Sequence, residues 1–170
     1  LVEGEELTQQ LAEARFLRGY FYFELQKIFG NPAYISEENF KNLEFNQPNT
    51  GPVWAQIEAD YQFAIDNLEP MNEQGQIGKP NSWTAKAFLG KTYVYQGKYS
   101  EALTLLNDVI NNGPYDLLPE FVDNFRLKGE GGVESVFAIQ FTADPGNSWN
   151  GNRGGTLNFP GVDVLGTSCC

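Results

Sequence analysis

The 170-residue sequence contains no histidine, and its two cysteines are the last two residues, Cys169 and Cys170. Without histidine the chain lacks the commonest general base, pH switch and metal ligand, so an enzyme here would have to work with carboxylates. Two adjacent terminal thiols provide neither a disulfide framework nor the spacing of a zinc site. The glycines of "GEGG", residues 129–132, lack the Lys-Ser/Thr of a phosphate-binding loop. We therefore expect a protein that is not an enzyme and has no metal site and no cofactor.

Basic residues and long hydrophobic runs are also scarce. Eleven Lys and Arg face 22 Asp and Glu, and the net charge of −11 disfavours nucleic acid as a partner. The most apolar run, residues 16–25, is interrupted by Arg18 and Glu24 and is shorter than the roughly 20 residues of a membrane span. The chain opens without methionine or a basic leader segment, so we expect a piece of a longer protein.

Residues 5–29 contain no proline and predict one long helix. Apolar residues recur at steps of three and four along a first stripe, which we expect to be buried: Leu7, Leu11, Ala14, Leu17, Phe21, Leu25 and Ile28. A second stripe lies a third of a turn away: Ala12, Phe16, Tyr20 and Phe23. Two apolar stripes predict a helix that is covered by neighbours on two sides.

The pattern of helices predicts a mainly α fold built from helical hairpins. A second helix is expected at 53–68, after a long polar surface loop at 31–51. The segment 83–114 matches the spacing of the tetratricopeptide repeat at Leu89, Gly90, Tyr93, Gly97, Tyr99, Ala102, Leu106 and Pro114. In that repeat small residues such as Gly90 and Ala102 stand where two helices approach closely. We expect hairpins at about 5–68 and 83–112.

The last third of the chain changes in texture. Val133, Val136 and Ile139 predict a short β segment near 133–141, within a loop and strand region at 113–170. We interpret residues 1–170 as a single, partial domain.

Taken in order, these segments resemble the SusD/RagB-like glycan-binding lipoproteins of the Bacteroidetes outer membrane. The blocks that carry the resemblance are "AEARFLRGYFYFELQKIFGNPAYI", "VWAQIEADYQFAIDNLEP", "KPNSWTAKAFLGKTYVYQGKYSEALTLLNDVINNGPYDL" and "ESVFAIQF". They cover nearly all of residues 8–142. The resemblance implies tetratricopeptide-like hairpins that support long irregular loops, and binding without catalysis.

The resemblance also implies a setting. The family's proteins face outward from the outer membrane on a lipidated N-terminal cysteine, and they cap a SusC-like TonB-dependent transporter that imports the captured oligosaccharide or polysaccharide. This chain has no lipidation cysteine near its start and stops where the family continues into a large C-terminal portion. We expect both parts in the full-length protein.

The loop "GNSWNGNRGG" is the candidate ligand site. Trp149 would stack on a sugar, and the polar neighbours Asn147, Asn150, Asn152 and Arg153 would bond its hydroxyls. The alternative, which we prefer on composition alone, is that Trp149 pins its own loop and that Asn and Gly are turn residues.

Other conspicuous residues are given structural roles. We expect Trp54 and Trp83 to pack at helix starts, and Arg15 and Arg18 to bond either to helix carbonyls or to an acid such as Asp60. Glu37 and Glu38 lack the spacing of a calcium loop, and a solvated face explains them.

Two functional classes remain beside the glycan-binding subunit. The repeat at 83–114 equally favours a tetratricopeptide-type protein interaction module that binds no sugar. A glycosidase would need two converging carboxylates, and no spacing nominates such a pair.

Overall fold

A computed structural model describes residues 4–71, 78–126, 129 and 131–139 of the chain. It confirms the predicted, mainly α fold. Residues 1–138 form one compact unit and residues 139–170 a second. Every helix given below belongs to the first unit. The prediction that 1–170 is a single domain stays a prediction.

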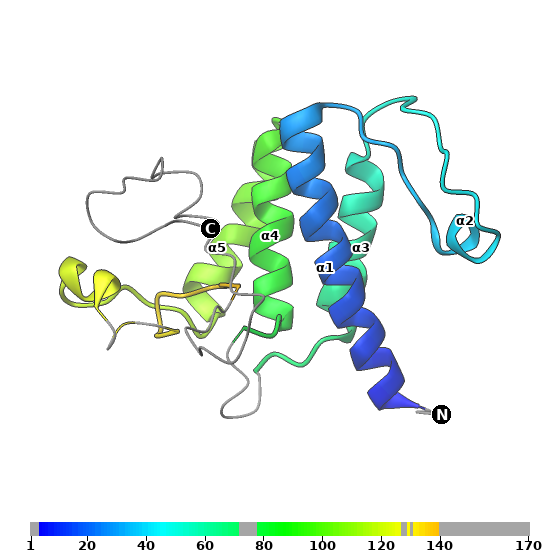
Figure 1. The fold of residues 1–170 in the computed structure, drawn as a ribbon. Coiled ribbons are helices and arrows are strands. Elements are labelled where there is room, and N and C mark those ends of the chain that lie inside the picture. The colour runs from blue at the N-terminus through cyan, green and yellow to red at the C-terminus, as the bar shows by residue number, and fades with distance from the viewer. Residues whose placement is uncertain (1–3, 72–77, 127–128, 130, 140–170) are drawn as a thin grey trace, which may run out of the picture. The chain divides into compact units, whose positions relative to one another are not determined.

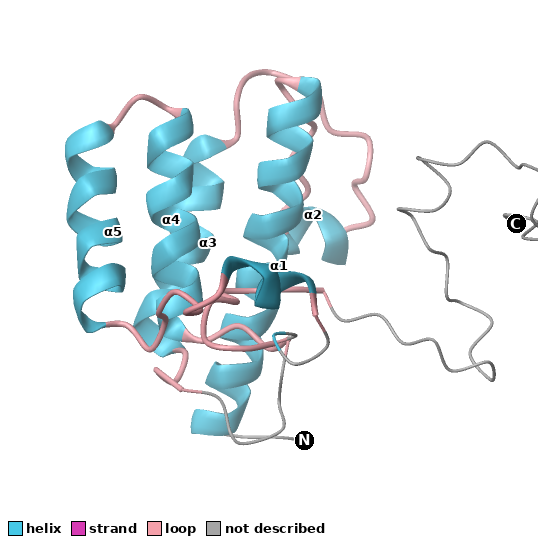
Figure 2. Ribbon diagram, turned by 90° about the vertical axis from the view of Figure 1, so that its left-hand side faces the viewer, coloured by secondary structure: helices cyan, strands magenta, loops and turns pink. Residues whose placement is uncertain are grey.

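Four helices stand side by side in chain order, each packing on the next: α1 (Glu5–Phe29), α3 (Trp54–Asn67), α4 (Ser82–Tyr95) and α5 (Tyr99–Asn112). Neighbours in this row run antiparallel, as in stacked hairpins (Figure 1). In the chain a short helix, α2 (Glu37–Lys41), comes between α1 and α3; it lies apart from the row in Figure 1, and Figure 2 shows it behind α1. The sequence predicted only a loop there. A 3-10 helix, Phe121–Phe125, follows α5.

The helix boundaries follow local signals. Gly30 ends α1 with φ 79°, and Gly97 makes the turn between α4 and α5 with φ 75°, a region that favours glycine. Asn81 caps α4, because its side chain accepts a hydrogen bond from the Thr84 N–H at 2.8 Å. These signals lie within a few residues of each boundary, which explains why the predicted helix limits agree with the structure.

The core is formed by α1, α3 and α4. Phe16 is fully buried, and its ring lies 5.6 Å from that of Tyr61 on α3 and 5.4 Å from that of Phe88 on α4. The buried apolar residues of these helices are Ala12, Phe16, Phe23, Ile57, Tyr61, Ala64, Ala85 and Leu89. The second stripe of the N-terminal helix therefore faces the core.

The first stripe of α1 is exposed, and the expectation that it is buried was wrong. Leu7 is 50% exposed, Phe21 56% and Ile28 65%. Within the described residues the helices that pack on α1 are α3 and, at fewer positions, α4, so helices cover one side of α1 rather than two. This apolarity does not mark a membrane span, because no helix of the described segments is long and apolar enough to cross a bilayer.

The hairpin of α4 and α5 packs as the repeat spacing predicts. A Cβ placed on Gly90 would lie 2.8 Å from Cδ2 of Leu106, so a larger residue at position 90 would clash with α5. Ala102, one turn before Leu106, is buried. Lys86 joins the two helices through Asp108 at 2.5 Å and lies 4.2 Å from the ring centroid of Trp83, and the purely structural role expected for Trp83 stays a prediction.

The β segment predicted near 133–141 is absent from its described part, residues 133–139. The segment instead supplies a core side chain: the Phe137 ring lies 5.1 Å from that of Phe16. Its backbone is held by a side chain, because the Thr84 hydroxyl donates to the Val136 carbonyl at 3.1 Å. No neighbouring strand in the described chain offers it a ladder of hydrogen bonds.

Tyr61 carries a buried hydroxyl that has no hydrogen-bond partner among the described residues. Burial, the largest cause, raises the pKa of this hydroxyl above the ordinary tyrosine value. An unpaired buried donor costs about 1–3 kcal/mol, so we expect Tyr61→Phe to raise the free energy of unfolding by about 1 kcal/mol in urea titrations. A loss of stability would show that the hydroxyl has a partner, such as an ordered water.

Candidate ligand-binding site

The sugar-binding residues predicted from sequence, Asn147, Trp149, Asn150, Asn152 and Arg153, lie outside the described residues, as do Cys169 and Cys170. They stay predictions. The described part of the chain contains a different candidate, a hollow between the α1–α3 connection and the start of α3.

The connection, residues 30–53, is fastened to one polar stripe of α1. Arg15, Arg18, Tyr22 and Gln26 recur at steps of three and four, so they share a face between the core and the exposed apolar stripe. Each of them bonds to the connection or to α3. The long connection is thereby fixed in place rather than hanging free.

Gln26 ties the two ends of the connection together. Its buried side-chain amide donates to the Gly30 carbonyl at the first end. Its Oε1 accepts a hydrogen bond from the Val53 N–H at 2.7 Å at the other end. One amide thus closes the loop at its base, where α1 stops and α3 starts.

Tyr22 holds the next part of the connection. Its hydroxyl accepts a hydrogen bond from the Ile35 N–H at 2.8 Å, and its ring lies 5.0 Å from that of Tyr34. The guanidinium of Arg18 lies 5.6 Å from the Tyr34 ring centroid. Burial, ahead of the nearby charges, raises the pKa of the Tyr34 hydroxyl, which therefore stays neutral at physiological pH.

A cluster of two arginines and two carboxylates braces this corner, and it confirms the predicted pairing of Arg15 and Arg18 with Asp60. Arg18 binds Asp60 through two nitrogens, at 2.7 Å and 2.5 Å, and Arg15 lies 3.3 Å from the same carboxylate. Asp60 is 1% exposed. Its hydrogen bond is the largest cause that raises the pKa of Arg18. A buried carboxylate held by two guanidinium groups satisfies the charges that α1 brings into the interior.

Glu37 completes the cluster from the surface: its side chain is 50% exposed, as predicted for a solvated face, and it also pairs with both arginines, which the sequence did not predict. Its oxygens lie 3.0 Å from Arg15 and 2.9 Å from Arg18. Its backbone N–H and then Arg18 lower the pKa of Glu37 below its ordinary value of 4.5. Its contribution to stability is therefore present above that value and is lost as the pH falls through the lowered pKa.

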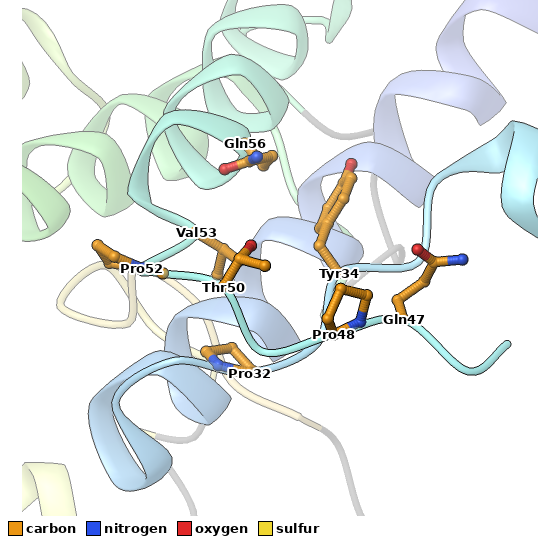
Figure 3. A pocket seen from close by; sticks show the side chains of 9 residues that line it. Pro32, Tyr34, Gln47, Pro48, Thr50, Pro52, Val53 and Gln56 are labelled. Carbon is orange, nitrogen blue, oxygen red and sulfur yellow. The ribbon is translucent and has the colours of Figure 1, made fainter.

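The hollow has a volume of about 190 Å³. The connection contributes most of its lining, and α3 contributes one residue of its first turn, Gln56; the lining residues of the connection are Pro32, Tyr34, Gln47, Pro48, Thr50, Gly51, Pro52 and Val53. Figure 3 shows the Tyr34 and Gln56 side chains on the same side of the group, with Thr50 and Pro48 below them in the view. None of these lining residues carries a charge.

Gln56 has a buried polar atom that the fold leaves unsatisfied. Its Oε1 is shielded from solvent and has no hydrogen-bond partner in the described structure. Val53, the residue that precedes α3, cannot cap the helix with its side chain. The lining therefore includes both a residue with an unused acceptor and an aromatic ring, which are features that proteins use to bind neutral polyhydroxyl ligands.

The end of α2 carries local strain. Glu44 N–H bonds to the Asn39 carbonyl and Leu43 N–H to the Phe40 carbonyl, which is the glycine-type helix ending. Leu43 occupies the glycine position with φ 58° and is 74% exposed. We expect Leu43→Gly to raise the free energy of unfolding by up to about 1 kcal/mol, because glycine adopts this conformation without cost. Thermal unfolding of both proteins measures the change, and an unchanged or lower value for Leu43→Gly contradicts it.

The sequence analysis missed Tyr22, Gln26 and Gln56. A signal for the first two was present, because they continue the spacing of Arg15 and Arg18 on one helical face. Gln56 gave no such signal, since an amide in the first turn of a helix is ordinarily solvent-exposed.

Comparison with protein families matches residues 2–94, more than half of the chain, to the SusD-like model described as "Starch-binding associating with outer membrane". A SusD-like protein of Bacteroides ovatus is 31% identical over 150 residues, which are 79% of this chain and 26% of that protein. SusD-like protein P2 of Formosa agariphila is 29% identical over 147 residues, which are 82% of this chain and 29% of that protein.

Solved structures show the same similarity. A laminarin-binding SusD-like protein superposes with a TM-score of 0.79 at 30% identity, covering 88% of this chain and 34% of that one. A protein crystallised with a xylogluco-oligosaccharide superposes with a TM-score of 0.75 at 28% identity, covering 88% and 32%. The chain thus spans about a third of the length of these proteins or less.

Proposed function

The chain belongs to the SusD-like family of starch-binding proteins that associate with the outer membrane, and from this membership we propose that it is part of a glycan-binding protein without enzymatic activity. The observation that carries the proposal is the family match over residues 2–94. The similarity to a laminarin-binding protein at 30% identity supports a polysaccharide or oligosaccharide as the ligand. Capture is non-covalent, by stacking and hydrogen bonds to neutral sugar hydroxyls.

The proposal extends to the cellular setting that such a protein requires. The protein would face outward from the outer membrane, held by a lipid anchor, and would pass its glycan to a SusC-like TonB-dependent transporter for nutrient uptake. Co-purification of such a transporter with the tagged full-length protein from membrane extract supports this part. Recovery of an unrelated soluble partner instead supports the alternative interaction module. The exposed apolar stripe of α1 is the feature that favours that alternative.

Affinity electrophoresis of the full-length protein tests the glycan part. We expect slower migration in gels that contain at least one of laminarin, xyloglucan, starch or a host glycan, and unchanged migration in plain gels. Unchanged migration across the whole panel contradicts the proposal. Release of reducing sugar from a retained glycan would contradict the absence of catalysis.

A further inference from the structure

We propose that the hollow between the α1–α3 connection and the start of α3 holds one neutral sugar residue of a bound glycan. The side-chain oxygen Oε1 of Gln56 accepts a hydrogen bond from one of the sugar's hydroxyls. The inference rests on the proposed glycan-binding function and assigns a place to it. It concerns described residues only, and it is separate from the loop at 147–153.

The side chain of Gln56 carries an unsatisfied hydrogen-bond acceptor. Oε1 of Gln56 is shielded from solvent and bonds to no described residue. A buried polar atom without a partner is costly, and native structures keep such atoms rarely. Gln56 lines the hollow, so a rotation of its side-chain amide would bring Oε1 within reach of a hydroxyl that enters and supply the missing hydrogen bond. A sugar ring carries several hydroxyls that act both as donors and as acceptors.

The other lining residues supply the groups that bind sugars. Tyr34 supplies an aromatic surface, Gln47 a second amide and Thr50 a hydroxyl (Figure 3). Sugars are recognised by this combination of an aromatic ring with amides and hydroxyls. Pro32 and Pro48 add apolar surface for the C–H groups of a ring.

The walls of the hollow carry no charged side chain. The guanidinium of Arg18, which lies 5.6 Å from the Tyr34 ring centroid, is engaged by Asp60 and Glu37. The chain as a whole carries a net charge of −11. An anionic ligand would find no cation in the walls and a repulsive field around them. A cationic ligand would find no carboxylate in the lining. The site therefore selects a neutral ligand.

The hollow is small and its walls are rigid. A volume of about 190 Å³ is smaller than the roughly 300–1,000 Å³ of pockets that enclose drug-sized ligands, so it suits one ring of a longer chain. Pro32, Pro48 and Pro52 restrict the backbone of the walls, and Gln26 closes the loop at its base. A wall that is rigid before binding loses less entropy when the ligand arrives.

Gln56→Met in the full-length protein tests the site. Methionine has nearly the same length and carries no unsatisfied acceptor, so the variant should fold with an unchanged or raised melting temperature. We expect its affinity for the retained polysaccharide to fall about threefold to tenfold in calorimetry, the range for one lost hydrogen bond. Gln62→Met is the matched control, because Gln62 is an exposed residue of the same helix, bonds to Asp66 and does not line the hollow. Its affinity should equal that of the wild type.

A second readout uses single sugars as probes. Methyl glycosides of glucose, galactose, mannose, xylose and N-acetylglucosamine are titrated at millimolar concentration into protein labelled with nitrogen-15 at glutamine. At least one of them should shift the side-chain amide signal of Gln56 and leave that of Gln62 in place. If none shifts the Gln56 signal, or if Gln56→Met binds the polysaccharide as tightly as the wild type, the site is refuted. If the wild type binds no polysaccharide at all, it is the proposed function that fails.

Discussion

Replacing Asp60 by alanine is expected to lower the free energy of unfolding by about 3–5 kcal/mol. The Asp60 carboxylate is almost completely buried and binds the Arg18 and Arg15 side chains. Its removal leaves two partly buried guanidinium groups with only Glu37, whose carboxylate is half exposed and screened by solvent. The loss should appear as a lower urea midpoint with an unchanged m-value, since the surface exposed on unfolding stays the same.

Asp66→Ala is the matched control for this prediction. Asp66 stands on the same helix, is exposed and bonds only to Gln62 among the described contacts. Its replacement should change the free energy of unfolding by no more than about 0.5 kcal/mol. If the two variants lose stability equally, the loss is not specific to the buried carboxylate and the cluster does not stabilise the corner, since alanine has the higher helix propensity and cannot itself cause the loss.

The pairing of Asp60 could be predicted from the sequence, whereas that of Glu37 could not. Arg15 and Arg18 stand in an aromatic-rich helix, where a guanidinium needs helix carbonyls or an acid as partners, and the structure shows that the acid Asp60 is the partner of both. Asp60 lies in the next long helix, so a hairpin of the two brings it near. Glu37 reaches the same arginines only because the connection folds back over α1, and that path depends on the contacts of Tyr22 and Gln26.

The helices and the β segment differ in how far local sequence decides them. Gly30, Asn81 and Gly97 end or start helices through their own backbone or side chains, so their effect is visible in the sequence. A strand also needs a neighbouring strand to pair with. Residues 133–139 have the apolar composition of a strand, but the described structure offers them no strand to pair with. Phe137 enters the core instead, and composition carries no information about that choice.

The candidate site shows the same limit. The sequence predicted a candidate sugar-binding site at 147–153 from the polar residues that neighbour Trp149 in the chain, which is a local property. The hollow at Gln56 is assembled from both ends of a long connection and from the first turn of α3. Each of its residues is unremarkable alone, so only the three-dimensional structure brings them together.

The stripes of α1 lead to the second large effect, because periodicity reveals apolar faces but not which of them is covered. Phe16 and Phe21 stand on the same helix, and the sequence assigned both to buried stripes. In the structure Phe16 is fully buried among the rings of Tyr61, Phe88 and Phe137, whereas Phe21 is 56% exposed. We expect Phe16→Ala to lower the free energy of unfolding by about 3–5 kcal/mol, since it removes a buried ring and leaves a cavity.

Phe21→Ala is the matched control for Phe16→Ala, because it makes the same change on the same helix at an exposed position. The same chemical change at a position that is 56% exposed should cost clearly less, about 1 kcal/mol, because only part of the ring is removed from water on folding and no cavity is left. Chemical denaturation of both variants measures the difference directly. If Phe21→Ala costs as much as Phe16→Ala, the outer stripe of α1 is covered in solution, and the assignment of the core to the inner stripe alone fails. If both variants cost little, the aromatic cluster around Phe16 does not hold α1, α3 and α4 together.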